Sequence, residues 1–326
     1  MKKRGYDLIG DVHGCANSLI RLLDRLGYSK KNGVFEHPHR RAVFVGDIID
    51  RGPRIREALH LVRDMVERGS AQVIMGNHEY NALGYCTRAR PGSERTYLRE
   101  HTDRHARMLK ETLDQFEHHP VDWQDFICWF YTLPLFLEFD CFRIVHACWD
   151  ETLISRYKSQ FRRNTIDEDF LHASVVNGSF AGLVMNRLLR GTDLRLPDGE
   201  KIMGQDGIER SVFRTRFWAD NPQTYNDVVF QPDPLPESVA QRPISEQDRK
   251  CLLAYPPGQL PVFVGHYWMS GTPGPLKPNV ACLDYSAVKY GKLAAYRMDE
   301  ERVLSADKFV WIEVDRELCT REITGR

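Results

Sequence analysis

The chain has 326 residues, in which 45 Lys+Arg balance 45 Asp+Glu, and 42% of the residues are hydrophobic. This composition is that of an ordinary globular protein, and it excludes a disordered, a fibrous and a membrane-spanning chain. The charge balance also argues against a general basic coat for nucleic acid, although it leaves room for a local positive pocket.

The cysteines and the N-terminal segment indicate a cytoplasmic protein. None of the eight cysteines forms a C-x-x-C pair, so neither a zinc ribbon nor a redox dithiol is indicated. Asp7, Gly10 and Asp11 interrupt the apolar stretch after the first four residues, which favours a strand over the core of a secretory signal. No segment approaches the roughly 18 apolar residues of a membrane span. We therefore expect reduced thiols and no membrane contact.

The first third of the chain alternates predicted strands and helices. Short β-rich runs occupy residues 6–9, 42–45 and 73–75. Apolar residues at helical spacing separate these runs, namely Leu19, Leu22, Leu23 and Leu26, and then Ile55, Leu59, Val62 and Val66. A β-α-β-α-β order predicts adjacent strands joined by helical crossovers.

The remaining two thirds are more varied. Residues 94–117 are predicted to form a charged helix, and the runs 135–139 and 142–145 to form a hairpin. Residues 150–260 give helical stretches and turn signals without a clear pattern. Strand-like runs return at 262–264, 280–283, 293–297 and 309–314. The chain is thus expected to open as β-α-β and to close largely as β.

Each of the first three predicted strands ends in a glycine followed by a polar residue. The segments are Gly10-Asp11-Val12-His13-Gly14, Gly46-Asp47-Ile48-Ile49-Asp50-Arg51-Gly52 and Gly76-Asn77-His78-Glu79. Ligands gather at the carboxyl ends of strands in open α/β sheets, so these segments should converge on one site. The glycines permit tight turns and close backbone approach.

The polar residues of these segments are suited to divalent cations. Asp11 and His13 can face the same way in an extended chain, where they offer oxygen and nitrogen to one cation. Asp47 supplies a carboxylate that can bridge two cations, and Asn77 supplies an amide oxygen. The sequence therefore indicates a metal site at this edge.

The three segments resemble the G-D-x-H-G, G-D-x-x-D-R-G and G-N-H-E signatures of calcineurin-like metallophosphoesterases, in the phosphoprotein-phosphatase branch. The resemblance covers residues 6–80 and two later histidine motifs. It implies an α/β fold of two packed mixed β-sheets, a β-sandwich flanked by helices, with a dinuclear metal centre at one end. It also implies two late histidines as metal ligands, and His146 and His266 stand at the expected places.

Two departures from the family pattern concern these histidines. His146 is followed by Ala147-Cys148-Trp149 where phosphatases have Gly-Gly or Ala-Gly, which alters the wall near the second metal. His266 is followed by Tyr267-Trp268 and lacks the second histidine of many phosphodiesterase members. That lack, with Asp50-Arg51, favours the phosphatase branch.

The expected chemistry is the metal-dependent hydrolysis of a phosphoric ester. Two cations activate a water for in-line attack on phosphorus. His78 is the expected general acid, Asp50 is expected to fix its tautomer, and Arg51 to bind phosphate oxygens. A second phosphate clamp is expected among Arg210, Arg214 and Arg216, and Arg214 is the preferred candidate.

The resemblance favours Mn²⁺ as the metal, with Fe or Zn²⁺ as alternatives. The resemblance implies a serine/threonine or tyrosine phosphoprotein as the first candidate substrate. The second candidate is a dinucleoside polyphosphate such as diadenosine tetraphosphate. For the second class Tyr267, Trp268 and Tyr285 are candidates to contact adenine. A catalytically silent scaffold that binds phosphorylated partners is the alternative of another class, and a nucleic-acid substrate is disfavoured. We expect one domain over residues 1–326, with a possible helical cap at 85–130.

Overall fold

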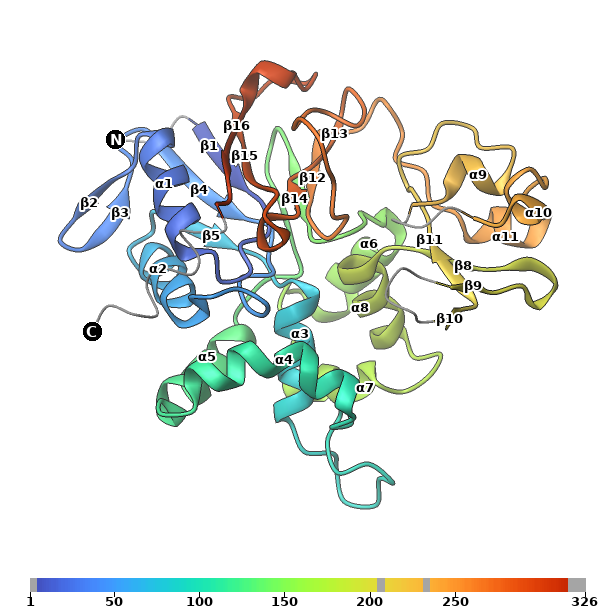
Figure 1. Cartoon of the computed structure of the whole chain (residues 1–326), viewed down its shortest axis with the longest axis horizontal. Coiled ribbons are helices and arrows are strands. Elements are labelled where there is room, and N and C mark those ends of the chain that lie inside the picture. Colours follow the sequence, from blue (N-terminus) through green and yellow to red (C-terminus); the bar gives the residue numbers. More distant parts are fainter. Residues whose placement is uncertain (1–4, 204–208, 231–234, 316–326) are drawn as a thin grey trace.

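Strands from both ends of the chain share the larger of two central β-sheets (Figure 1). The computed structural model describes residues 5–203, 209–230 and 235–315. The larger sheet has the order β14-β15-β1-β4-β5, with β16 paired to β15. Its strands are β1 (Gly5–Ile9), β4 (Arg40–Phe44), β5 (Ala71–Val73), β14 (Asp284–Tyr285), β15 (Lys292–Met298) and β16 (Phe309–Glu313). β1, β4 and β5 are parallel, whereas β15 runs antiparallel to β1.

The smaller sheet has four strands in the order β13-β12-β7-β6. They are β6 (Phe136–Glu138), β7 (Arg143–Val145), β12 (Val262–Val264) and β13 (Val280–Cys282). β7, β12 and β13 are parallel, and β6 pairs antiparallel with β7, which confirms the hairpin expected there.

The two sheets pack face to face through alternate residues of their strands. Leu8, Val43, Ile144 and Phe263 belong to one buried cluster with residues of both sheets. Their neighbours Ile9, Phe44, Val145 and Val264 belong to a second cluster that includes the helices. This alternation follows from the period of two in a strand, and it confirms the sandwich of two mixed sheets flanked by helices.

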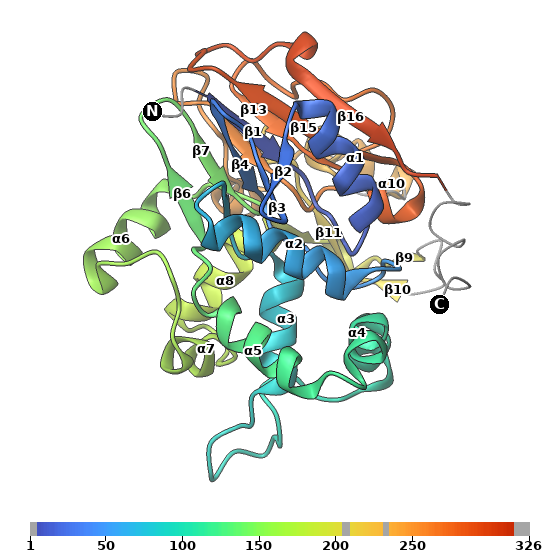
Figure 2. The ribbon, with the colours of Figure 1, turned by 90° about the vertical axis from the view of Figure 1, so that its left-hand side faces the viewer.

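Helices cover the outer faces of the sandwich. Figure 2 shows α1 (Ala16–Leu26) and α2 (Ile55–Glu67) against the larger sheet. α3 (Asn77–Cys86) begins soon after β5, and α4 (Asp103–Phe116) and α5 (Pro120–Phe130) follow it. α4 packs on α2 and α5 packs on α3.

The helix expected over 94–117 begins only at Asp103, so its first part was predicted wrongly. Thr102 caps the helix by accepting a hydrogen bond from the backbone N–H of His105. Before it the chain is held as a loop, because the Leu98 N–H donates to the Thr87 carbonyl and the Arg99 N–H donates to that of Gly84. The predicted start of the helix was based on the spacing of apolar residues, which does not reveal this cap.

The segment that gave no clear sequence pattern forms helices and then a lobe with a small core of its own. The helices are α6 (Glu151–Phe161), α7 (Glu168–Ser174) and α8 (Phe180–Arg190). The lobe, at the right of Figure 1, contains β8 (Asp193–Arg195), β9 (Ile202–Met203), β10 (Glu209–Arg210), β11 (Val212–Arg214), α9 (Tyr225–Val228), α10 (Glu237–Ala240) and α11 (Glu246–Cys251). Leu194, Phe213, Tyr225 and Val239 are among its buried residues. A hairpin of β2 (Ser29–Lys31) and β3 (Val34–Glu36) lies at the opposite end of the molecule.

None of the helices in the described ranges is long and apolar enough to cross a membrane. No disulfide joins any of the seven cysteines that the structure describes.

The two sheets meet beyond the end of β12, where Gly265 faces the larger sheet. A Cβ atom on Gly265 would lie 2.0 Å from Oδ1 of Asp11 and 2.9 Å from Cγ2 of Val45. We predict that Gly265→Ala lowers the free energy of unfolding by about 1–3 kcal/mol, because the methyl group must displace the Asp11 carboxylate. Urea denaturation of Gly258→Ala is the control, since no atom lies within 4 Å of a Cβ at Gly258. Equal midpoints for the two variants would contradict the prediction.

Candidate dinuclear metal site

The expected metal ligands all follow the carboxyl ends of parallel strands. In the larger sheet Ile9 pairs with Phe44, and Phe44 pairs with Val73, so the three strands end side by side. The chain beyond these ends carries Asp11, Asp47 and Asn77. In the smaller sheet β7 and β12 are likewise parallel, and His146 and His266 follow their ends. Strand direction alone therefore brings residues from both sheets to one end of the sandwich.

One oxygen atom, Oδ2 of Asp47, lies at the centre of this group. It lies 3.3 Å from Nε2 of His146, 3.7 Å from Nε2 of His13 and 3.9 Å from Nε2 of His78. All four side chains are buried. Two sets of three potential ligands share this carboxylate, namely Asp47 with His13 and His78, and Asp47 with His146 and His266.

The side chain of Asn77 joins the two late histidines. Its Oδ1 lies 3.1 Å from Nε2 of His146 and 2.6 Å from Nδ1 of His266. Nδ1 of His146 donates to the Val45 carbonyl, which turns the other ring nitrogen toward Asp47 and Asn77. Such a contact on the far nitrogen commonly orients a metal-binding histidine.

Within the described part of the chain, two buried polar atoms of the proposed metal ligands have no hydrogen-bond partner. They are Oδ1 of Asp11 and Nε2 of His266, and the other Asp11 oxygen accepts the His266 N–H. Buried polar atoms are nearly always paired, so these two fit ligands of a cation. The nitrogen and oxygen donors also suit a first-row divalent metal. The residues therefore fit a dinuclear centre, although Asp11 belongs to neither of the two three-residue sets.

The electrostatics of the site follow from burial and from the close packing of like groups. Burial, followed by the charge of His78, holds the pKa of His13 well below its ordinary value. Burial and the Arg214 guanidinium act in the same direction on the pKa of His266. Burial works to raise the pKa of Asp47, but His146 and His78 outweigh it, and the pKa lies well below the usual range. The pKa directions of His13, His266 and Asp47 suit ligands of a cation. Two other proposed ligands shift the opposite way: burial would lower the pKa of His146 but Asp47 raises it to about 10, and burial followed by Asp284 raises the pKa of Asp11 well above its usual range.

His78 is held by a pair of residues from two other elements. Its Nδ1 lies 2.5 Å from Oδ2 of Asp50, as the sequence indicated. The other Asp50 oxygen accepts a hydrogen bond of 2.5 Å from the Thr112 hydroxyl, and the Asp50 N–H donates to that hydroxyl. Thr112 lies on α4, and no motif marked it. The Nε2 atom of His78 remains turned toward the metal site.

Glu79 is a second residue whose role sequence reasoning missed. Its buried carboxylate accepts hydrogen bonds from the backbone N–H groups of Asp47, Ile48 and Gly76 at 2.8–2.9 Å. A longer contact of 3.4 Å joins it to the N–H of Ile49. Glu79 thereby ties the turn that carries Asp47 to the start of α3. The Gly-Asn-His-Glu motif contained this residue but gave no reason for it.

The backbone of the site adopts conformations that cost energy. His13, Asp47, Asp50, Arg51 and His266 all have a positive φ, between 43° and 70°. Residues with a side chain seldom adopt this region, and such strain gathers at functional sites. The packing around these turns must therefore stabilise them.

The arginines divide into those that face the site and those that do not. Nη1 of Arg51 lies 3.5 Å from Nε2 of His13, and its guanidinium lies 4.7 Å from the ring centre of Trp268. Arg214 lies 5.9 Å from the ring centre of Tyr267 and acts on His266. Arg216 lies beyond β11 and donates to the Asn226 carbonyl. Arg210 belongs to the small β9–β10 pair.

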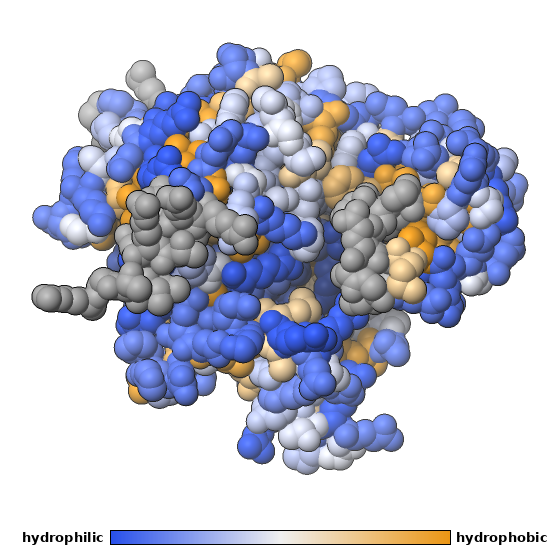
Figure 3. Space-filling model, viewed as in Figure 1, coloured by the Kyte–Doolittle hydropathy of each residue, from blue (hydrophilic) through white to orange (hydrophobic). Residues whose placement is uncertain are grey.

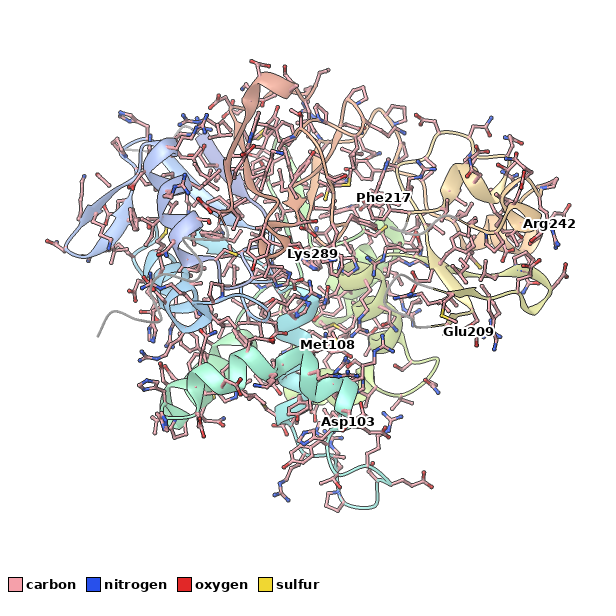
Figure 4. The ribbon with its side chains drawn as sticks, in the orientation of Figure 1. Asp103, Met108, Glu209, Phe217, Arg242 and Lys289 are labelled. Carbon is pink, nitrogen blue, oxygen red and sulfur yellow. The ribbon has the colours of Figure 1, made fainter. Side chains whose placement is uncertain are left out.

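The three aromatic candidates for nucleotide contact differ in their exposure to solvent. Tyr267 and Tyr285 are buried, whereas Trp268 is 37% exposed. The Trp268 N–H donates to Asp284, a buried carboxylate that no motif marked. The Lys289 ammonium group lies 3.5 Å from the Trp268 ring centre, and Figure 4 shows Lys289 near the middle of the molecule. Arg51, Trp268 and Lys289 thus form a cationic and aromatic patch beside the metal ligands.

Comparison with known proteins agrees with this site. The family described as calcineurin-like phosphoesterase matches residues 6–266, and the chain belongs to this family of metallophosphoesterases. Among curated relatives, the asymmetrical bis(5'-nucleosyl)-tetraphosphatase PrpE of Oceanobacillus iheyensis is 36% identical over 153 residues, which are 46% of this chain and 58% of that protein. PrpE of Halalkalibacterium halodurans is 49% identical over 74 residues, 22% of this chain and 30% of that protein. The match thus covers between 30% and 58% of the length of these relatives.

Solved structures share the fold. A serine/threonine phosphatase from Saccharomyces cerevisiae, similar to human PP5, has a TM-score of 0.51 and 14% identity, and the match covers 97% of this chain and 82% of that one. A cold-active protein-tyrosine phosphatase of a Shewanella species has a TM-score of 0.50 and 17% identity, over 96% and 81% of the two chains. At these identities the likeness concerns the fold alone.

We predict that Glu79→Gln weakens the binding of Mn²⁺ by about 10- to 100-fold, as is typical when a residue that orients metal ligands is lost. The amide places an N–H₂ group toward backbone donors and cannot hold the turn around Asp47. Isothermal titration calorimetry measures the affinity. Glu111→Gln, an exposed change on α4, is the matched control. Wild-type affinity in the Glu79 variant would show that the turn forms without this carboxylate.

Proposed function

We propose that the chain is a metal-dependent phosphohydrolase, and that dinucleoside polyphosphates are its substrate class. The observation that carries the reaction is the position of Asp47 Oδ2 among imidazoles that come from both sheets. Asp11, His13 and Asp47 would hold one divalent cation, and Asp47, Asn77, His146 and His266 a second. When bound, the cations supply an activated water and compensate charge on the phosphate. Mn²⁺ is the first candidate, and Fe and Zn²⁺ are the alternatives.

His78 is the proposed general acid. Because Asp50 occupies its Nδ1, the proton that it can give away lies on Nε2, the nitrogen that faces the metal site. In that position it can protonate the oxygen that leaves phosphorus. Thr112 keeps Asp50 in place and so acts as a positioning residue.

Arg51 and Arg214 are the proposed ligands of the phosphate that reacts. Each offers a planar set of N–H donors, which suits phosphate oxygens. Arg51 lies on the side of the larger sheet, next to the proposed metal ligand His13. Arg214 lies at the end of β11 in the lobe, next to Tyr267. The two groups would hold the phosphate from opposite sides.

The patch of Arg51, Trp268 and Lys289 supports a nucleotide substrate. A polyphosphate chain offers negative charge to the two cations, and a base offers an aromatic surface to the exposed indole. The names of the PrpE relatives point to the same class. A phosphoprotein is the second candidate substrate, because Asp50-Arg51 and the single histidine of Gly265-His266 resemble the phosphatase branch.

A substrate panel with added Mn²⁺ tests the proposal. The panel contains diadenosine tetraphosphate, a phosphoserine and a phosphotyrosine peptide, and a chromogenic aryl phosphate. We expect the highest kcat/KM for diadenosine tetraphosphate. Higher values for the peptides would establish the second candidate, and no metal-dependent turnover of any substrate would overturn the proposal.

We also predict that His78→Asn and Asp47→Asn fail in different ways. His78→Asn should lower kcat by about 10²- to 10⁴-fold, the usual contribution of a general acid, while the protein still binds two metal ions. Asp47→Asn should bind metal poorly, because it loses the shared carboxylate. Metal content after dialysis, measured together with kcat, separates the two roles. His118→Asn, at an exposed histidine, is the control. Loss of one metal ion from His78→Asn would make His78 a ligand.

A further inference from the structure

Two arginines that the reaction does not use, Arg99 and Arg190, lie along α3 beside the metal site. Nη2 of Arg190 donates to Oδ1 of Asn81 at 2.8 Å, and its guanidinium lies 5.3 Å from the Tyr80 ring centre. The Cβ of Arg99 lies 3.3 Å from the place where a Cβ on Gly84 would stand, and its N–H donates to the Gly84 carbonyl. Arg190 is therefore bound to α3 through its side chain, and Arg99 through its backbone.

The contacts follow one face of this helix, starting at a proposed metal ligand. Residues 77, 81 and 84 are four and three positions apart, so their side chains lie above one another on the same face. At 1.5 Å per residue they stand roughly 6 Å and 10 Å from Asn77 along the helix axis. Asn77 holds the two late histidines, Asn81 holds Arg190, and Gly84 makes room for Arg99. This face of α3 therefore contacts, in order from the metal site, the two late histidines, the guanidinium of Arg190, and the backbone and Cβ of Arg99.

Neither arginine has a carboxylate partner within ion-pair distance in the ranges that the structure describes. Arg190 donates to the side-chain amides of Asn81 and Asn186, and Arg99 contacts Sδ of Met108 at 3.8 Å. Met108 lies on α4, and Figure 4 shows it near the middle of the view, below Lys289. Arg99 and Arg190 are each half-buried as whole residues.

The charges of these arginines act on one another. Burial, followed by the charge of Arg190, lowers the pKa of Arg99 to about 10. Burial also lowers the pKa of Arg190, and the charge of Arg214 acts in the same direction. Asp193 opposes this effect at Arg190 but does not pair with it. Like charges that have no carboxylate partner in the described ranges favour an anion, and Figure 3 shows strongly hydrophilic residues around a recess at the middle of the molecule.

We propose that Arg99 and Arg190 form a second phosphate subsite, which binds the phosphate next to the one that reacts at the metal site. The inference rests on the proposed function and narrows it, because only a substrate with at least two linked phosphates can occupy both subsites. A phosphopeptide or an aryl phosphate has a single phosphate and leaves the second subsite unused. The guanidinium donors match the non-bridging oxygens of a phosphate chain.

Direct binding to the Mn²⁺-loaded protein tests the subsite without requiring turnover. Calorimetry compares inorganic phosphate with imidodiphosphate, in which a nitrogen bridge between two phosphates resists hydrolysis, at one fixed concentration of free Mn²⁺. We expect the wild-type protein to bind imidodiphosphate at least tenfold more tightly than phosphate. In Arg99→Gln and in Arg190→Gln this preference should fall about tenfold, since each variant loses charge-assisted hydrogen bonds. Arg107→Gln, an exposed change on α4, should keep the wild-type preference.

The outcomes separate the inference from the proposed function. An unchanged preference in both subsite variants would overturn the inference, even if dinucleoside polyphosphates are hydrolysed. A preference that depends on the two arginines would support the subsite, even if the substrate panel shows no turnover. If Arg190→Gln does not fold, Arg99→Gln decides the question, and Arg190→Lys should restore part of the preference because it keeps the charge.

Discussion

The buried carboxylate of Asp47 is the constraint around which the rest of the site is arranged. Three imidazole nitrogens lie within 4 Å of its Oδ2 atom, and they belong to histidines that follow β1, β5 and β7 in the chain. The backbone at Asp47 has a positive φ, and the carboxylate of Glu79 accepts hydrogen bonds from the N–H groups of Asp47 and Ile48 in the same turn. Strand order, a strained backbone and buried hydrogen bonds therefore together fix the position of this one oxygen atom. Ligands held in this way need little rearrangement when a cation binds.

The same arrangement explains how a chain with no net charge can bind a polyanion. Asp11, Asp47 and Asp50 lie close together, and the proposed cations would offset their charge. Around them stand Arg51, Arg214, Arg190 and Arg99, which come from distant parts of the chain. With the proposed cations bound, the site would carry a local excess of positive charge that the overall balance does not show, and this excess would attract phosphate.

Local signals made the centre of the site predictable. Gly-Asp and Gly-Asn pairs at strand ends led to Asp11, Asp47 and Asn77, and register in a parallel sheet made their convergence a simple consequence. His78 and Asp50 were paired correctly because their motif spacing is specific. Thr112, Arg190 and Arg99 could not be found in this way. Their roles depend on how α4, α8 and the loop before α4 pack against α3, and such long-range packing leaves no mark in a short stretch of sequence. The start of α4 was misplaced because charged residues before Thr102 resemble a solvent-exposed helix face.

The central claim is that Asp47 is shared by two metal ions, and electron paramagnetic resonance of the Mn²⁺-loaded protein tests it most directly. Two Mn²⁺ ions bridged by one carboxylate are magnetically coupled, whereas two separate ions give the ordinary spectrum of isolated Mn²⁺. The account predicts two Mn²⁺ per chain with a coupled spectrum, which Asp47→Asn abolishes. A single Mn²⁺ per chain, or two ions with the isolated spectrum, would contradict it.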